Sequence, residues 1–313
     1  MTITGYAVLT PAQQESILAL TQRVASHDGA CPLNEEATLA ITGGAGSHMC
    51  AWDKDTLVAY AYVDQDGAGS SAQILVDPGH RRQTIATQLV ARLGADTDLW
   101  AFGNLEPAQL FCAAQGFTPV RGLLVMERDM STAGIPDDVA PTPGGDPAFG
   151  RTTNGDVRLT GWNDQDLDAL VRLNARTFAS HPEQGKLTRD DFLARMQSDW
   201  FDPEGLLLAT NSQGQLIGFH WTKVDHDVGE VYVLGVDPDY EGMGVGRRLL
   251  DAGLAHMADL GVHTVKLWVE DDNLAAQSLY VKSGFSPIRS DIRYRRITGG
   301  PCEPNERHLP DLY

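Results

Sequence analysis

Residues 230–247 read EVYVLGVDPDYEGMGVGR, and this stretch decides the expected fold. Residues 230–236 are rich in β-branched side chains and precede Asp237-Pro238, so they predict a strand that ends at a loop. Residues 241–247 contain three glycines and lead into a helix, where backbone N–H groups and the helix dipole can bind a pyrophosphate. Glycine suits this position because a side chain would keep the backbone away from the phosphates.

Other folds also use glycine-rich loops, so residues 241–247 have three further interpretations. A Rossmann site is disfavoured because the preceding residues belong to a hairpin-rich sheet, in which residues 206–210 and 215–222 flank Asn-Ser-Gln-Gly. A P-loop is disfavoured because no Gly-Lys-Ser/Thr follows. A glycine turn without any ligand is the third interpretation, and it is the least favoured in this context.

The rest of the second half predicts an α+β domain. Apolar residues recur at helical spacing from Leu249 to Met257, and residues 264–269 predict a strand. Residues 273–282 predict a short helix, and residues 288–296 alternate as a final strand. We therefore expect a mixed, mostly antiparallel sheet flanked by helices.

The first half repeats this order of motifs, which indicates a tandem arrangement. Residues 74–78, ILVDP, match residues 234–238, LGVDP, and a basic segment at 80–86 takes the place of the glycine-rich loop. Each half then has Leu-Trp, an asparagine and Gly-Phe, at 99–100, 104 and 116–117 and at 267–268, 273 and 284–285. The first copy is shorter between these motifs, which a shorter helix after its loop would explain.

A segment without apolar periodicity separates the copies. Residues 131–150 are dense in Pro, Gly and Asp and predict a linker. We expect an N-terminal domain at 1–130, a C-terminal domain at 151–298 and a tail at 299–313.

Composition limits the class of protein. A length of 313 residues suits two domains, and a formal net charge of -18 disfavours binding to nucleic acid or to anionic membranes. Cys31, Cys50, Cys112 and Cys302 lack paired spacing, so neither a metal site nor a disulfide framework is indicated. No signal segment or membrane-spanning apolar stretch is seen, and we expect a monomer in the cytoplasm.

The order of Val-Asp-Pro, loop, helix, strand, Asn-x-x-Ala, Tyr and Gly-Phe resembles that of the GNAT N-acetyltransferases. The resemblance implies two tandem GNAT folds with acetyl-CoA as co-substrate. The sequence departs from the pattern at Glu241, where the family usually has Gln or Arg, and at Thr84, which replaces the central glycine of the first copy. Binding by loop amides should survive the first change, whereas the second weakens the case for the first domain.

The resemblance also implies which residues contact acetyl-CoA. In the second domain they are Leu234, Gly235, Val236, Glu241, Gly242, Met243, Gly244, Val245, Gly246, Arg247, Asn273, Leu274, Ala275, Ala276, Gln277 and Ser278. In the first domain they are Ile74, Leu75, Val76, Arg82, Gln83, Thr84, Ile85, Ala86 and Thr87.

Acetyl transfer needs a deprotonated amine, a polarised thioester carbonyl and a proton for the departing thiolate. In the family a backbone amide at the end of the strand, here within 234–236, meets the carbonyl, and Tyr280 occupies the position of the general acid. Glu230 is our candidate general base, because period-two alternation predicts that it shares a face with Leu234. Each residue also has a purely structural interpretation, in which Tyr280 is an aromatic side chain packed in the core and Glu230 is a solvent-exposed carboxylate. The first copy has Phe111 or Cys112 at the matching site, so we expect it to be degenerate and non-catalytic.

Over essentially its whole length the chain resembles tandem GNAT enzymes that acetylate the cysteinyl amine of cysteinyl-glucosaminyl-inositol (desacetylmycothiol) to give mycothiol. The resemblance includes the segments NEEA at 34–37, HPEQG at 181–185, WTK at 221–223 and LWVEDDN at 267–273. It implies an acceptor site, in which carboxylates bind sugar and inositol hydroxyls, made of Glu36, Glu183, Lys223, Glu230 and Trp268. Trp268 stands where the family commonly has tyrosine.

Two rival functions stay open. One is acetylation of another small amine, such as an aminoglycoside or a polyamine, or of a protein N-terminus. The other is a non-catalytic acyl-CoA sensor, which Glu230 and Tyr280 disfavour for the second half but which the first half alone fits. Whether the first domain holds acetyl-CoA is a further open point.

Overall fold

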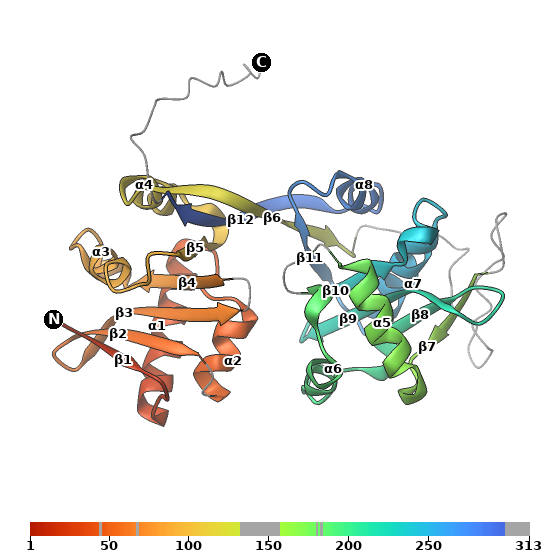
Figure 1. Ribbon diagram of the computed structural model, residues 1–313, viewed down its shortest axis with the longest axis horizontal. Helices are drawn as coiled ribbons and strands as arrows, with labels where there is room; N and C mark the ends of the chain where they lie inside the picture. Colours follow the sequence, from red (N-terminus) through yellow and green to blue (C-terminus); the bar gives the residue numbers. More distant parts are fainter. Residues whose placement is uncertain (44–45, 67–68, 132–156, 180, 182–183, 298–313) are drawn as a thin grey trace, which may run out of the picture. The chain divides into compact units, whose positions relative to one another are not determined.

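The computed structural model describes residues 1–43, 46–66, 69–131, 157–179, 181 and 184–297. The chain forms two compact units (Figure 1). Unit 1 comprises Met1–Gly122 and Ser290–Tyr313, and unit 2 comprises Leu123–Arg289. The predicted linker beyond residue 131 and the predicted tail lie outside the described residues, so the domain bounds inferred from them stay a prediction.

Unit 1 is a mixed sheet with two helices on each face. Its strand order is β1-β2-β3-β4-β5-β12, and only the β4–β5 pair among these is parallel. The strands are β1 (Thr2–Tyr6), β2 (Ser47–Asp53), β3 (Thr56–Asp66), β4 (Gly69–Val76), β5 (Thr97–Ala101) and β12 (Ser286–Arg296). Helices α1 (Pro11–Asp28) and α2 (Glu35–Gly43) cover one apolar cluster, and α3 (Ile85–Val90) and α4 (Glu106–Ala114) cover the other.

Unit 2 repeats this arrangement. Its strand order is β6-β11-β10-β9-β8-β7, with β10 and β11 parallel. The strands are β6 (Phe117–Asp129), of which residues 123–129 belong to this unit, β7 (Arg158–Gly161), β8 (Leu206–Thr210), β9 (Leu216–Asp225), β10 (Val228–Val236) and β11 (Thr264–Glu270). Helices α5 (Leu167–Thr177) and α6 (Arg189–Met196) pack on one face, and α7 (Val245–Asp259) and α8 (Leu274–Lys282) pack on the other. The predicted α+β class is confirmed.

Two strands are exchanged between the halves of the sequence. Residues 292–294 of β12, from the C-terminal half, pair with 99–101 of β5, and Tyr294 is buried in the core of unit 1. Residues 123–129 of β6, from the N-terminal half, pair with β11, and Met126 is buried in the core of unit 2. Each unit is therefore completed by a strand from the other half, which local sequence patterns do not reveal.

The difference in length between the copies lies mainly in one helix. Helix α7 has 15 residues, whereas its counterpart α3 has 6. A shorter helix was predicted from the closer spacing of the motifs, and the observed lengths agree with it. None of the helices in the described ranges is long and apolar enough to cross a membrane.

Candidate active site

Strand β10 carries a bulge that decides which side chains meet. Val231 pairs with Thr222 of β9, and Val233 pairs with Trp221, so Tyr232 is an extra residue in the strand. As a result, Val231 packs in the cluster formed with α7, whereas Val233 packs in the cluster formed with α5 and α6.

The bulge changes the expected geometry of the candidate base. Before the bulge Glu230 lies opposite Val231, on the α5/α6 face, and after it Leu234 lies opposite Val233, on the α7 face. The prediction that Glu230 and Leu234 share a face is wrong, because one extra residue shifts the period-two pattern by one.

Strands β10 and β11 separate directly after Glu230. They pair at 228–230 with 264–266, and the remaining residues of β10 pair with β9 alone in the described structure. Asp237 donates its backbone N–H to Ile217 O at 2.8 Å. Because backbone groups alternate in direction along an antiparallel pair, the N–H groups of Leu234 and Val236 point to the side that β11 has left. These two amides can donate to a ligand carbonyl placed between the strands.

The loop after β10 has the backbone conformation of an anion cradle. Asp237 accepts from the N–H of Asp239 at 3.0 Å, and Arg176 of α5 lies 3.2 Å from Asp237. Gly242 and Gly244 have φ angles of 72° and 81°, which L side chains rarely adopt. The space around both glycines is open, so it is the backbone conformation that requires them. Gly244 precedes α7, whose first N–H groups therefore face the loop.

The other predicted cofactor residues of unit 2 lie at helix ends. Arg247 is in the first turn of α7, where its Nε donates to Asp251 at 2.8 Å. Asn273 caps α8, because its Oδ1 accepts from the N–H of Ala276 at 3.1 Å. Residues 274–278 form the start of α8 and are exposed or half-buried. The predicted residues thus gather at two helix N-termini, where backbone donors are available to phosphates and amides.

Tyr280 lies on the α7 face, opposite to Glu230. It is 7% exposed and belongs to the apolar cluster that contains Val231. Its ring packs edge-on against Phe285, with centroids 5.8 Å apart. Burial raises the pKa of Tyr280, so the phenol keeps its proton at neutral pH.

The α5/α6 face around Glu230 gathers charged and aromatic side chains. Lys223 is the cross-strand partner of Glu230, and its Nζ lies 4.9 Å from the Trp200 ring centroid and 5.6 Å from that of Tyr232. Leu267 and Val269 of β11 are buried in the α7-side cluster, so Trp268 between them faces the same side as Glu230 and is 40% exposed. Three of the five predicted acceptor residues therefore share one face of unit 2.

The structure does not place the other two predicted acceptor residues on this face. Glu36 lies in α2 of unit 1, and Glu183 lies outside the described residues. The sequence missed Trp200, Tyr232 and Glu270, and a carboxylate oxygen of Glu270 lies 3.6 Å from Nε2 of His181. His181 and Glu270 stand inside the quoted segments HPEQG and LWVEDDN, whereas no local pattern marks Trp200.

Comparisons with known proteins identify the family of the chain. The acetyltransferase (GNAT) family matches residues 167–285. A mycothiol acetyltransferase of Thermomonospora curvata is 39% identical over 294 residues, covering 92% of this chain and 95% of that protein. One of Propionibacterium freudenreichii subsp. shermanii is 40% identical over 299 residues, covering 93% and 92%. The chain belongs to the mycothiol acetyltransferase family.

Solved structures share the fold. A GCN5-related N-acetyltransferase from Sphaerobacter thermophilus has a TM-score of 0.72 at 21% identity, covering 94% of this chain and 95% of that one. A tandem GNAT protein from the clavulanic acid biosynthesis pathway has a TM-score of 0.69 at 17% identity, covering 96% and 99%. The expected tandem GNAT fold is confirmed, and the chain is an N-acetyltransferase of a family that uses acetyl-CoA.

Within this mycothiol acetyltransferase fold, unit 1 lacks the features of the candidate site. Strand β4 pairs with β3 in continuous register, without a bulge, and stays paired with β5 as far as Gln73. Matching the two registers from Asp77 and Asp237 places Ser71 where unit 2 has Glu230. In unit 1 the parallel strands therefore stay paired further along, so the unpaired end of β4 is shorter than that of β10. Unit 1 also has no carboxylate at the position of the candidate base.

The structure also decides between Phe111 and Cys112. Helices α4 and α8 both have 9 residues and both end two residues before Gly-Phe, which matches Cys112 with Tyr280. Cys112 is buried in the core, as Tyr280 is, whereas Phe111 is half-buried. Burial raises the pKa of the Cys112 thiol to about 11.

The loop of unit 1 keeps the shape of its counterpart without the glycines. Arg82 and Thr84 have φ angles of 62° and 61°, at the positions of Gly242 and Gly244. A positive φ at a β-branched residue such as Thr84 is a strained conformation. The predicted contacts Ile74, Leu75 and Val76 end β4, and Ile85, Ala86 and Thr87 begin α3. The geometry of an anion cradle is thus retained at a conformational cost.

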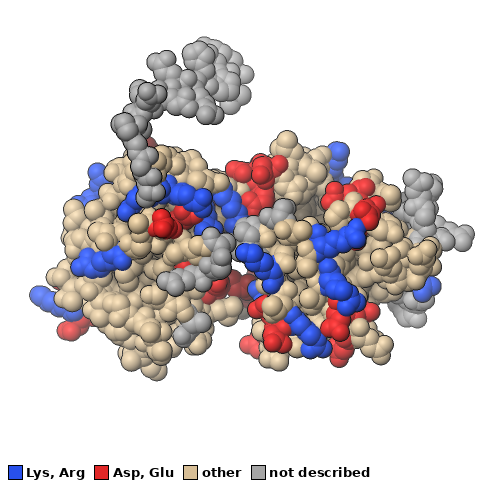
Figure 2. Space-filling view, viewed as in Figure 1, with Lys and Arg blue, Asp and Glu red and all other residues tan. Residues whose placement is uncertain are grey.

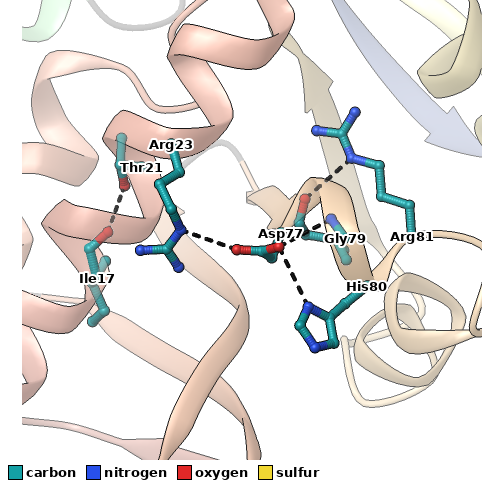
Figure 3. A network of polar contacts seen from close by, with 8 residues as sticks. Ile17, Thr21, Arg23, Asp77, Gly79, His80 and Arg81 are labelled. Carbon is teal, nitrogen blue, oxygen red and sulfur yellow. Dashed lines mark hydrogen bonds and ion pairs between the residues drawn. The ribbon is translucent and has the colours of Figure 1, made fainter.

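Polar contacts fix the start of this loop (Figure 3). Asp77 accepts from Arg23 of α1 and from the N–H of Gly79, both at 3.0 Å. Burial alone would raise the pKa of Asp77, but these hydrogen bonds outweigh it and lower that pKa. Arg81 is held in turn by Asp28, with nitrogen–oxygen distances of 2.9 and 2.7 Å. Arg23 thus plays the part in unit 1 that Arg176 plays in unit 2.

Proposed function

We propose that unit 2 transfers the acetyl group of acetyl-CoA to the cysteinyl amine of desacetylmycothiol, which gives mycothiol. The observation that carries this proposal is the separation of β10 from β11 immediately after Glu230, with Tyr280 on the opposite face. An acceptor on the α5/α6 face and a donor on the α7 face would meet at this opening.

Each chemical step has a candidate group. The N–H groups of Leu234 and Val236 would polarise the thioester carbonyl, since they point into the opening. Glu230 would accept a proton from the cysteinyl ammonium, directly or through water, and free the amine for attack on the carbonyl carbon. The C–N bond forms, the C–S bond breaks, and Tyr280 would donate its proton to the departing thiolate.

The residues that are present fit acetyl-CoA as the donor. Gly242 and Gly244 shape the loop that leads to the N-terminus of α7, whose first N–H groups can meet a pyrophosphate, and the start of α8 adds further backbone donors. No cluster of metal-binding side chains occurs among the residues that the structure describes, and the proposed chemistry requires none.

The acceptor assignment draws on the family and on the chemistry of one face. Glu230, Lys223 and Trp268 offer a carboxylate, an ammonium and an aromatic surface to a polar, hydroxyl-rich amine. We propose that Glu36 and Glu183 complete the acceptor site, and that the protein acts as a cytoplasmic monomer.

Unit 1 is proposed to be non-catalytic. Ser71 and Cys112 stand at the positions of Glu230 and Tyr280, whereas the loop at Arg82 and Thr84 keeps a conformation suited to phosphates. This combination favours binding of acyl-CoA without transfer, through the residues of unit 1 named above.

The experiment that tests the function is acetyl transfer to a panel of amines, followed by mass spectrometry. The panel contains cysteinyl-glucosaminyl-inositol, an aminoglycoside, a polyamine and a peptide with a free N-terminus. We expect N-acetylation of cysteinyl-glucosaminyl-inositol with the highest kcat/KM. A higher kcat/KM with another amine would identify that amine as the acceptor instead. Binding of acetyl-CoA without any turnover would favour the function of a sensor.

A further inference from the structure

Unit 1 contains a cavity of about 260 Å³ that lies outside every site described above. Arg293, Arg295 and Arg296 of β12 line it together with Asp98 of β5 and Ser70 of β4. Figure 2 shows a band of Lys and Arg side chains, with acidic side chains beside it, over the part of unit 1 where Figure 1 draws β12. In a chain with a net charge of -18, such a gathering of arginines is unusual.

The charges around the cavity do not cancel. Asp98 is 2% exposed and accepts from Arg293 Nε at 2.7 Å and from Arg295 at 3.0 and 2.8 Å. One buried carboxylate thus faces two guanidinium groups. Asp96 adds a second carboxylate to the lining and Arg296 a third guanidinium, so three positive charges against two negative ones leave a net charge of +1.

Arg296 supplies a donor that lacks a protein acceptor. Its Nε is buried and forms no hydrogen bond with any part of the chain that the structure describes. The guanidinium is held in place by the Phe117 ring, whose centroid is 4.7 Å from Cζ. The rest of the Arg296 guanidinium is the part that an anion in the cavity could meet, since Arg296 is one of the lining residues.

The cavity is distinct from the predicted acyl-CoA contacts of unit 1. Ser70 lies four residues before Ile74, the nearest of these contacts in the same strand, which corresponds to about 13 Å at the rise of an extended chain. The cavity is also smaller than the pockets of about 300–1,000 Å³ that hold drug-sized ligands. Both observations favour a small anion over a nucleotide.

We propose that this cavity binds a small phosphate anion, either free phosphate or the phosphate group of a small metabolite. Arg293, Arg295 and Arg296 bring three guanidinium groups to the lining of the cavity, and guanidinium is the side-chain group best suited to phosphate oxygens. Because these arginines belong to β12 and Asp98 to β5, a bound anion ties the exchanged strand more firmly to unit 1. The bound anion therefore stabilises unit 1 by mass action.

The test measures binding to the full-length protein by isothermal titration calorimetry and by thermal unfolding. Inorganic phosphate and glycerol phosphate are the probes, at constant ionic strength set with chloride, with and without saturating acetyl-CoA. Arg296→Gln removes the charge that does not pair with Asp98. Arg158→Gln, at an exposed position that begins β7 of unit 2, is the charge-matched control.

We expect saturable binding to the wild type and to Arg158→Gln, unchanged by acetyl-CoA, and at least about tenfold weaker binding to Arg296→Gln. Tighter binding of one probe identifies whether free phosphate or a phosphate ester is preferred. Absence of saturable binding overturns the proposal. It is equally overturned if Arg296→Gln binds as the wild type does, or if acetyl-CoA abolishes binding, because the anion would then occupy another site.

Discussion

Val231 and Val233 are two residues apart in β10, yet their side chains pack on opposite faces of the sheet. The extra residue between them, Tyr232, has no counterpart in β4 of unit 1, where the register with β3 is continuous. This bulge puts Leu234 on the α7 face, where Tyr280 lies, while Glu230 before it faces the α5/α6 side. The continuous register of β4 is one of the differences between unit 1 and the candidate site of unit 2.

Replacing Tyr280 with phenylalanine tests the proton donor. We expect kcat to fall about 100-fold, because a positioned general acid contributes on that scale or more, while acetyl-CoA binding is retained. The ring packing against Phe285 survives, so the thermal midpoint should change little. Tyr294→Phe in unit 1 is the control: it removes the 2.7 Å hydrogen bond to Asn104 and should cost about 1 kcal/mol of stability without lowering kcat. Equal kcat in Tyr280→Phe and wild type would refute the assignment.

Replacing Glu230 with glutamine tests the general base. We expect kcat/KM to fall about 100-fold, since the amide does not accept the proton. Glu127→Gln on β6 is the matched control, because Glu127 is a half-exposed strand carboxylate whose contact, at 3.6 Å, is Lys266. A Glu230→Gln enzyme that keeps the wild-type kcat/KM would show that another group removes the proton.

Replacing Gly244 with alanine tests the loop as a phosphate cradle. An L side chain at φ 81° is strained, so we expect a loss of about 1 kcal/mol in stability and about tenfold weaker binding of acetyl-CoA. Gly214→Ala is the control, because Gly214 has φ 76° and open space around it but lies in the β8–β9 hairpin. Calorimetry should separate the two variants, which share the strain and differ in ligand affinity. Equal affinities would contradict the assignment of the cradle.

The buried His220 predicts how stability depends on pH. Burial lowers its pKa from 6.5 to about 4, while its Nδ1 lies 2.8 Å from Leu249 O. The unfolded chain therefore takes up a proton at higher pH than the folded protein, so this stabilisation is present above pH 6.5 and is lost as pH falls towards 4. Over that window it amounts to about 3 kcal/mol. Urea unfolding of His220→Gln should give a flatter pH dependence than the wild type, and an unchanged slope would assign the effect to other groups.

The exchange of β6 and β12 between the halves of the sequence predicts which unit a core substitution destabilises. Tyr294→Ala should loosen unit 1 and Met126→Ala unit 2, each by about 3 kcal/mol, because each removes a buried side chain. Hydrogen exchange measured by mass spectrometry should then rise in β5 and α3 for the first variant and in β11 and α7 for the second. The opposite distribution would mean that each half of the sequence folds on its own strands.

Local features of the sequence were sufficient to predict the conformation of the loop proposed to bind phosphates. Asp237-Pro238 ends the strand because proline restricts the backbone, and Gly242 and Gly244 take positive φ angles that their lack of a Cβ permits. The same reasoning marked Thr84 as a departure, and the structure finds it at φ 61°. These outcomes depend on a few neighbouring residues, so they could be predicted.

The candidate site was only partly predictable because its assembly depends on distant residues. The sequence singled out Glu230, Lys223 and Trp268, but it placed Glu230 and Leu234 on one face. It also left the match to Tyr280 open between Phe111 and Cys112. Register and burial resolve both points, and neither is encoded in the spacing along one segment.

The sequence by itself determined the repeat, the α+β class and the loop with its glycines. These follow from local periodicity, backbone restrictions and the order of motifs. Only the tertiary structure decided that Tyr232 is an extra residue in β10 and that β6 and β12 complete the opposite units. The physical reason is that strand pairing joins residues far apart in the chain. The register of a strand pair depends on how both strands are buried together, and the sequence of one strand alone does not specify that.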